Sequence, residues 1–204
     1  MLKPRGTLIT ISARNKAFRL TKEIAEPLDL TKHLPFRVAV VSNLLALNRD
    51  WKIRDLCDLE PREMRVLLNI GSYMPIKSAD IAYQSRIDSY NVSRAVKALD
   101  KKGLIDIRRD EKSKNIKILA LNDQGKALYQ QLTTAMELRS KELESVLTAD
   151  ETSAFYNTLS KIEDKVEQLL AKQALTKIAR GEDAPGDQKE LIRWYKKGRS
   201  GDVG

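Results

Sequence analysis

The feature of the sequence that most constrains the fold is a change of hydrophobic period at Gly103. Upstream of it, apolar residues recur at spacings of three and four and predict a helix from Ser89 to about Lys102. The residues with this spacing are Val92, Ala95, Val96 and Leu99. Downstream the period is two, and the alternating apolar residues are Ile105, Ile107, Ile116 and Ile118. The sequence therefore predicts a helix that ends at Gly103 and leads into a β-hairpin.

The segments around this helix and hairpin complete a larger unit. A helix is predicted to begin at Pro61 and to be interrupted at Gly71. A short third helix follows with Ser78 as its N-cap, and residues 86–88 form a tight connection to the next helix. Residues 109–114 are all polar or charged, so they are expected to form the exposed loop of the hairpin. The predicted order is a short helix, a tight turn, a second helix and a hairpin. This is the order of a winged helix-turn-helix lobe.

Hydrophobic periodicity also predicts the flanking segments. One long helix is expected from Leu34 to about Asp55, with Pro35 at a first-turn position. Two further helices are expected, from about Asp123 to Leu147 and from the capping box of Thr148 and Glu151 onward. The predicted domains are an N-terminal arm at 1–30, dimerisation helices at 31–57 and 122–175, the winged helix-turn-helix lobe at 58–121 and a mobile tail at 179–204.

The last long helix carries an apolar stripe with the spacing of a helix–helix seam. Its members are Phe155, Leu159, Ile162, Val166 and Leu169. Such a stripe packs either in its own subunit's core or against a partner subunit. Because the helix lies outside the central lobe, we favour a homodimer. Beyond Ala179, glycine and proline stand among mixed charges and predict a tail, with a short docking helix at residues 191–197 as the alternative.

Composition favours a mainly α protein with a small β-hairpin wing, because 42% of the residues are hydrophobic and glycine and proline are sparse. The 204 residues include 37 basic and 28 acidic ones, and the net charge of +9 suits a polyanion such as DNA or an acidic membrane surface. No apolar stretch approaches the roughly 20 residues that span a bilayer, and residues 1–10 lack the apolar core of a secretory signal. We therefore expect a cytoplasmic protein with no membrane partner.

Catalytic, metal and cofactor sites are not expected. Cys57 and His33 are the only residues of their kinds, so a zinc site would need mainly carboxylate ligands. Carboxylate pairs such as Glu23 with Glu26 lie in polar segments, where nothing would raise a pKa or exclude water. We assign Cys57 a structural role over a redox one. His33 is interpreted as a solvated residue at a helix start, with a place in a ligand crevice as the alternative.

The helix after the tight turn carries the residues expected to contact nucleic acid. Between Arg86 and Lys117 ten cations stand against five acidic residues, which is the clustering that phosphate neutralisation requires. Short polar side chains in the first turns of the helix can reach base edges in a major groove. Tyr90 would contact DNA or, alternatively, pack on the helix below. The predicted DNA-binding residues are Ser89, Tyr90, Asn91, Ser93, Arg94, Lys97, Lys101, Arg109, Lys112 and Lys114.

These motifs together resemble the MarR family of transcriptional regulators, over roughly residues 34–170. The resemblance is carried by Leu34-Pro35-Phe36-Arg37, Ser42-Asn43, Met64-Arg65-Val66-Leu67, Ile81-Ala82, the run from Val92 to Ile105, Asp110 with Lys112, and the run from Leu121 to Leu128. It implies an obligate dimer in which the terminal helices of both subunits interlock. It also implies repression by promoter occupancy, with release when a small, often aromatic, inducer enters a crevice between lobe and dimer region.

The wing departs from the family pattern at one position. Where the family has Asp-x-Arg, this sequence has Asp110-Glu111-Lys112, and lysine lacks the planar fork with which arginine reads a minor groove. The wing at 109–114 would then lie on the DNA backbone or in the minor groove. The alternative function is that of an interaction or adaptor protein with the same fold, which acts mainly through protein partners.

Overall fold

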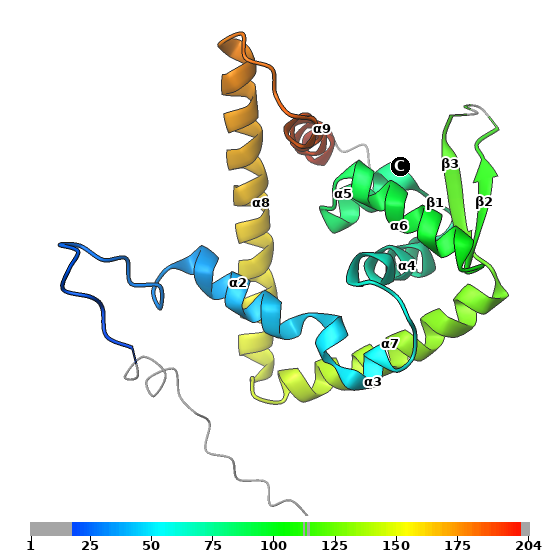
Figure 1. Cartoon of the computed structure of the whole chain (residues 1–204), viewed down its shortest axis with the longest axis horizontal. Coiled ribbons are helices and arrows are strands. Elements are labelled where there is room, and N and C mark those ends of the chain that lie inside the picture. The colour runs from blue at the N-terminus through cyan, green and yellow to red at the C-terminus, as the bar shows by residue number, and fades with distance from the viewer. Residues whose placement is uncertain (1–17, 112, 114, 201–204) are drawn as a thin grey trace, which may run out of the picture. The chain divides into compact units, whose positions relative to one another are not determined.

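The computed structural model describes residues 18–111, 113 and 115–200 (Figure 1). These residues fall into two compact units, which divide between Asp50 and Trp51. The first unit contains α2 (Leu34–Leu45) and the short 3-10 helix η1 (Leu47–Arg49). Nδ1 of His33 accepts a hydrogen bond from the Phe36 N–H at 3.3 Å, so His33 is the N-cap of α2. The helix-start position expected for His33 is thus the one that the structure has.

The long helix predicted from Leu34 to Asp55 is wrong. The backbone turns to extended geometry at Ala46, with a ψ of 123°, and again at Asp50, with a ψ of 113°. A new short helix, α3 (Trp51–Arg54), follows in the second unit. The interruption contains Asn48 and Asp50, residue types of low helix propensity, so local preference outweighs the continuing apolar pattern.

The second unit is built around a helical core with a small sheet beside it. The helices are α4 (Pro61–Tyr73), α5 (Ser78–Ser85) and α6 (Ser89–Lys101). The strands are β1 (Ile76–Lys77), β2 (Ile105–Arg109) and β3 (Lys117–Leu121), antiparallel in the order β1-β3-β2. The prediction of a mainly α chain with a hairpin wing is confirmed, and α6 ends as expected, with Gly103 just past its end at a φ of +67°.

Three local expectations in this unit need correction. Gly71 does not interrupt α4, because the helix continues to Tyr73 and the glycine instead makes room for the Tyr129 ring. Lys77, not Ser78, is the N-cap of α5. The strand β1 was not expected at all, since two residues are too few for an alternating pattern to be visible.

The core of the second unit is formed by apolar residues from all of these elements. Ile53, Met64, Leu67, Ile70, Ile81, Val92, Leu99, Leu119 and Leu132 are almost completely shielded from solvent. Leu132 belongs to α7 (Asp123–Glu144), whose N-cap Asn122 accepts a hydrogen bond from the Gly125 N–H at 2.9 Å. The hairpin and α7 are thereby fixed to the helices that precede them.

Two more helices complete the described chain. The long helix α8 (Ala149–Ala179) begins with the predicted capping box, in which Thr148 and Glu151 bond to each other's backbone N–H groups. Residues 186–200, expected within a tail, form α9 (Gly186–Ser200), which packs against α8. The structure therefore has the helix that was kept as the alternative for this segment. Among the described residues, no helix has both the length and the apolarity to cross a bilayer.

Gly125 gives a direct test of how tightly α7 is fixed. A Cβ at this position would overlap with the backbone carbonyl of Leu104, which cannot move aside as a side chain tip could. Gly125→Ala should lower the free energy of unfolding by roughly 2 kcal/mol, as overpacking of a core does. Urea denaturation measures the change. Gly186→Ala is the control, because a Cβ there has open space and should cause no loss; equal effects of the two would contradict the close approach.

Candidate nucleic-acid interface

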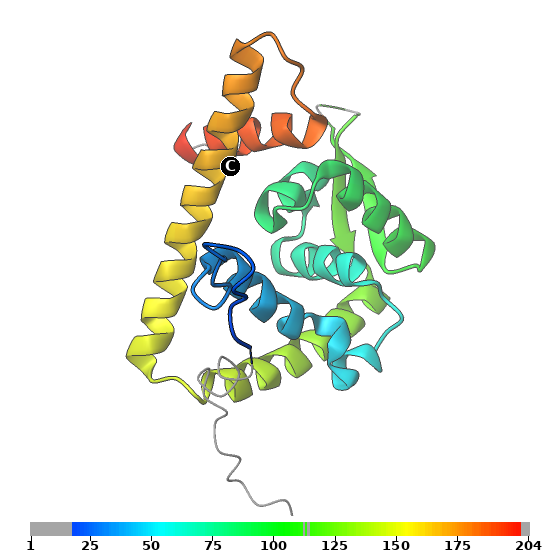
Figure 2. The same cartoon turned by 60° about the vertical axis from the view of Figure 1, so that its left-hand side comes forward.

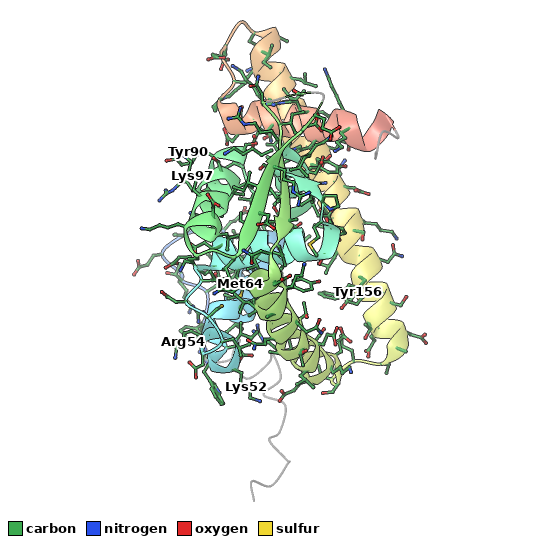
Figure 3. The ribbon with its side chains drawn as sticks, turned by 90° about the vertical axis from the view of Figure 1, so that its right-hand side faces the viewer. Lys52, Arg54, Met64, Tyr90, Lys97 and Tyr156 are labelled. Carbon is green, nitrogen blue, oxygen red and sulfur yellow. The ribbon has the colours of Figure 1, made fainter. Side chains whose placement is uncertain are left out.

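The two faces of α6 differ sharply in burial. Val92, Ala95, Val96 and Leu99 are buried against the rest of the second unit, chiefly against α4 and α5. The exposed residues of the helix include Ser89, Tyr90, Ser93, Arg94, Lys97 and Lys101. Figure 3 shows Tyr90 and Lys97 on the same outer side of the helix. Six of the predicted contact residues therefore lie on the exposed side of one helix.

Tyr90 and Arg94 lie next to each other on this exposed side. The guanidinium carbon of Arg94 is 5.8 Å from the centroid of the Tyr90 ring, and 69% of Tyr90 is exposed. The tyrosine is therefore not packed on the helix below, which was the alternative for it. A planar cation that rests on an aromatic face is held near one orientation, and this prepares it for contact with a planar or anionic partner.

The first turn of α6 is fixed by side chains that cap it. Oδ1 of Asp88 accepts a hydrogen bond from the Asn91 N–H at 2.8 Å, and Oδ2 accepts one from the Asn91 amide at 2.5 Å. Arg62 of α4 donates to Oδ1 of Asn91 at 3.2 Å. Asn91 was predicted to contact DNA, but in the structure its amide group binds Asp88 and Arg62. Sequence spacing could not show this, since Arg62 is distant in the chain.

Ser89 is also bound within the chain. Its N–H lies 3.1 Å and 3.3 Å from the two carboxylate oxygens of Glu190 in α9, and its hydroxyl group donates to the same carboxylate. Glu190 is only 9% exposed. The predicted contact residue at the very start of α6 thus faces a carboxylate from the C-terminal helix, which no sequence pattern indicated.

Of the ten cations between Arg86 and Lys117, two form ion pairs that stabilise the fold. Arg86, in the left-handed region at a φ of 53°, pairs with Glu167 of α8 at 2.5 Å and lies over the Tyr83 ring. Lys102 pairs with Glu63 at 3.7 Å and with Asp58 at 3.9 Å. These cations anchor the two ends of the helix. The basic side of α6 itself is formed by Arg94, Lys97 and Lys101.

The hairpin adds a second group of cations. Arg109 at the end of β2 lies directly opposite Lys117 of β3 in the strand register, and Arg108 precedes it. All three side chains are exposed. Like charges directly opposite each other destabilise a strand pair, and a polyanion at this place would relieve the repulsion. Lys112 and Lys114, also predicted to contact DNA, lie outside the described residues.

The remaining candidate residues of the sequence lie outside the basic side of α6. Among the described residues, no three histidine, cysteine or acidic side chains group as metal ligands would. Burial is the main cause that raises the pKa of the Cys57 thiol, which disfavours the reactive thiolate. Glu23 and Glu26 are exposed.

The arrangement of α5, the tight turn, α6 and the β2–β3 hairpin defines a winged helix-turn-helix lobe. Comparison with known proteins agrees with this class. Residues 58–114 match the model of the MarR family. The lobe therefore has the fold of winged helix-turn-helix regulators, and over these residues the chain is similar to the MarR family.

Relatives and solved structures of this kind are distant in sequence. An uncharacterized HTH-type transcriptional regulator of Bacillus cereus is 29% identical over 106 residues, which are 52% of this chain and 70% of the relative. A MarR family regulator of Listeria monocytogenes, solved with a 26mer DNA, has 20% identity and a TM-score of 0.63, over 76% of this chain and 99% of its own. The PcaV regulator of Streptomyces coelicolor, solved with its natural ligand, has 19% identity and a TM-score of 0.61, over 68% and 97%.

The cap of α6 generates a stability prediction. Asp88→Ala removes the acceptor for the Asn91 N–H and should lower the free energy of unfolding by about 1 kcal/mol at neutral pH. Asp100→Ala, an exposed aspartate near the other end of the helix, is the control and should cause no such loss.

The effect of Asp88→Ala should depend on pH in one direction. Hydrogen bonds from Asn91 hold the pKa of Asp88 below its ordinary value of 3.8. A group with a lowered pKa stabilises the fold above its ordinary pKa, and this contribution is lost as the pH falls through the lowered value. Urea denaturation should show a constant difference from wild type between about pH 7 and 5, which shrinks below about pH 4. A difference that grows on acidification would contradict the assignment.

Proposed function

We propose that the chain is a sequence-specific DNA-binding repressor that acts as a homodimer and inserts α6 into the major groove. The observation that carries this proposal is the exposed side of α6, where Arg94, Lys97 and Lys101 lie on a helix whose other side is held in the core. A major groove admits one α-helix, and the residues in its first turns reach the base edges.

Each exposed side chain receives a role from its chemistry. Arg94 donates to base edges or to an adjacent phosphate, and Tyr90 supports its guanidinium. Ser93 bonds to base edges, while Lys97 and Lys101 lie against the phosphates. Arg109 continues the phosphate contacts on the wing, where the sequence adds Lys112 and Lys114. Ser89 joins this surface only when Glu190 does not occupy it.

Solved proteins with the same fold support a DNA partner. Regulators solved with DNA include MepR of S. aureus, at 19% identity and a TM-score of 0.60, as well as the Listeria monocytogenes protein. Those structures show DNA bound by the same fold in other proteins. For this chain, the fold together with its own basic surface supports DNA binding.

The apolar stripe on α8 supports a homodimer. Phe155 is 51% exposed, Val166 is 45% exposed and Leu169 is 47% exposed, although their spacing is that of a packed helix seam. A continuous apolar stripe of this length is costly in water and marks an interaction surface. A second copy of the same helix covers it with complementary chemistry. The dimer also presents two copies of α6 to two half-sites on DNA.

Control of the repressor by a small, often aromatic, ligand is part of the proposal. Support comes from the PcaV structure, which contains that protein's natural ligand on the same fold. A ligand that binds the DNA-free arrangement better than the bound one releases the protein from the promoter. Isothermal titration calorimetry of operator DNA, with and without a panel of aromatic acids, tests this part.

Arg94→Ala tests the assignment of the reading helix. The substitution should weaken binding to a duplex selected by the wild-type protein by roughly 1–3 kcal/mol, and it should weaken binding to a random duplex less. Fluorescence anisotropy at fixed salt measures both affinities. Arg54→Ala removes an exposed arginine from α3, away from Tyr90 and Lys97 in Figure 3, and serves as the control. Unchanged specific affinity in a folded Arg94→Ala protein would show that another element reads the DNA.

The dimer has its own test on α8. Leu159→Asp together with Val166→Asp places charge in the seam and should give monomers with little DNA affinity. Ser153→Asp together with Asn157→Asp adds the same charge to exposed positions of the helix outside the stripe and should leave the dimer intact. Analytical ultracentrifugation at micromolar concentration measures the mass. A wild-type monomer under these conditions would overturn the dimer.

A further inference from the structure

The C-terminal helix α9 lies against the end of α6 that would meet DNA. Figure 2 shows α9, in orange to red, crossing α8 with its first turns beside the helices of the lobe. Ala171 and Ala174 of α8 are fully buried, and Ile192 of α9 is 9% exposed, so the two helices pack through small and apolar side chains. Besides α8, this helix contacts the helix-turn-helix unit, including the first residue of α6.

The contact between Glu190 and Ser89 has the chemistry of anion binding. The carboxylate lies at the N-terminus of α6, where unsatisfied N–H groups and the helix dipole favour negative charge. It accepts hydrogen bonds from both the N–H and the hydroxyl group of Ser89. A DNA phosphate at this helix end would use the same two donors. Glu190 and a phosphate therefore compete for one place.

Further contacts hold α9 in this position. Nζ of Lys197 is 2.8 Å from Oδ1 of Asp80 in α5 and 4.9 Å from the centroid of the Tyr83 ring. The guanidinium of Arg86, in the turn before α6, lies 5.7 Å from the centroid of the Trp194 ring. The helix is thus fixed near its start by Glu190 and near its end by Lys197, with both contacts made to the helix-turn-helix unit.

We propose that α9 is an autoinhibitory element, in which Glu190 occupies the phosphate-binding end of the recognition helix while the protein is free of DNA. This inference rests on the proposed function. Binding to DNA then requires that α9 withdraw, because Ser89 cannot donate to Glu190 and to a phosphate together. The apparent affinity for DNA is reduced by the fraction of molecules in which α9 is docked. Any event that displaces α9, such as a partner that binds this helix, would raise DNA affinity.

The test uses the full chain with single substitutions on α9. Glu190→Ala removes the carboxylate but keeps a good helix former, and Lys197→Ala removes the pair with Asp80. Each should bind a duplex selected by the wild-type protein about tenfold more tightly, which corresponds to about 1.4 kcal/mol. Glu182→Ala removes one negative charge from an exposed position just before α9 and should leave the affinity within about twofold.

A second readout follows the helix itself. In a Trp51→Phe background, Trp194 is the only tryptophan, and its emission reports whether α9 is docked. Glu190→Ala should shift this emission to longer wavelength, and addition of DNA to the protein with Glu190 intact should shift it in the same direction. The two effects are linked. If docking of α9 lowers the DNA affinity by a given factor, DNA binding lowers the equilibrium constant for docking by the same factor.

The possible results distinguish failure of autoinhibition by α9 from failure of the proposed DNA-binding function. Weaker DNA binding by both variants would show that α9 is a DNA contact, since its exposed Lys189, Arg193 and Lys196 could reach phosphates, and would overturn autoinhibition. Unchanged affinity would overturn it as well. If the wild-type protein and both variants select no duplex, the proposed function itself fails, and the inference falls with it.

Discussion

Burial of one side of α6 is the interaction on which the rest of the structure depends. Val92, Ala95, Val96 and Leu99 fill the space beside α4 and α5. Each of the three larger side chains contributes about 1.5–3 kcal/mol by leaving water. This packing fixes the rotation of the helix about its own axis. Because side chains at a spacing of three to four share a side, the same choice turns Tyr90, Arg94, Lys97 and Lys101 outward. The functional surface is thus a consequence of the core.

Charged residues near the two ends of α6 stabilise the fold, whereas the cations along the helix face solvent. Arg86 and Lys102 pair with acidic residues of other helices and hold the ends of α6 in place, and Asp88 caps its first turn. The cations between them have their side chains in solvent. A helix fixed at its ends and basic along its exposed side is preorganised, so that little conformational freedom is lost on binding to a rigid duplex. Glu190 adds one negative charge at the single place where the helix end would meet a phosphate.

Elements with a strong local signal could be predicted, and elements that depend on distant partners could not. The helix α6, the hairpin and the Thr148 capping box were predicted correctly because neighbours in sequence determine them. The prediction of one long first helix was wrong, because the backbone leaves the helix at Ala46. Gly71 was expected to break its helix, but it instead makes room for the ring of Tyr129, which is distant in sequence. Most predicted contact residues lie on the exposed side of α6. The partners of Ser89 and Asn91 were missed, because Glu190 and Arg62 reach them only through the tertiary fold.

Guanine N7 methylation interference on a duplex selected by the wild-type protein reports directly whether α6 reads the major groove as part of a dimer. We expect two clusters of interfering guanines about 10 base pairs or a multiple apart, one for each copy of the helix. Arg94→Ala should abolish interference at one position within each cluster. Interference absent from the major groove, with protection limited to phosphates, would show that α6 does not read base edges.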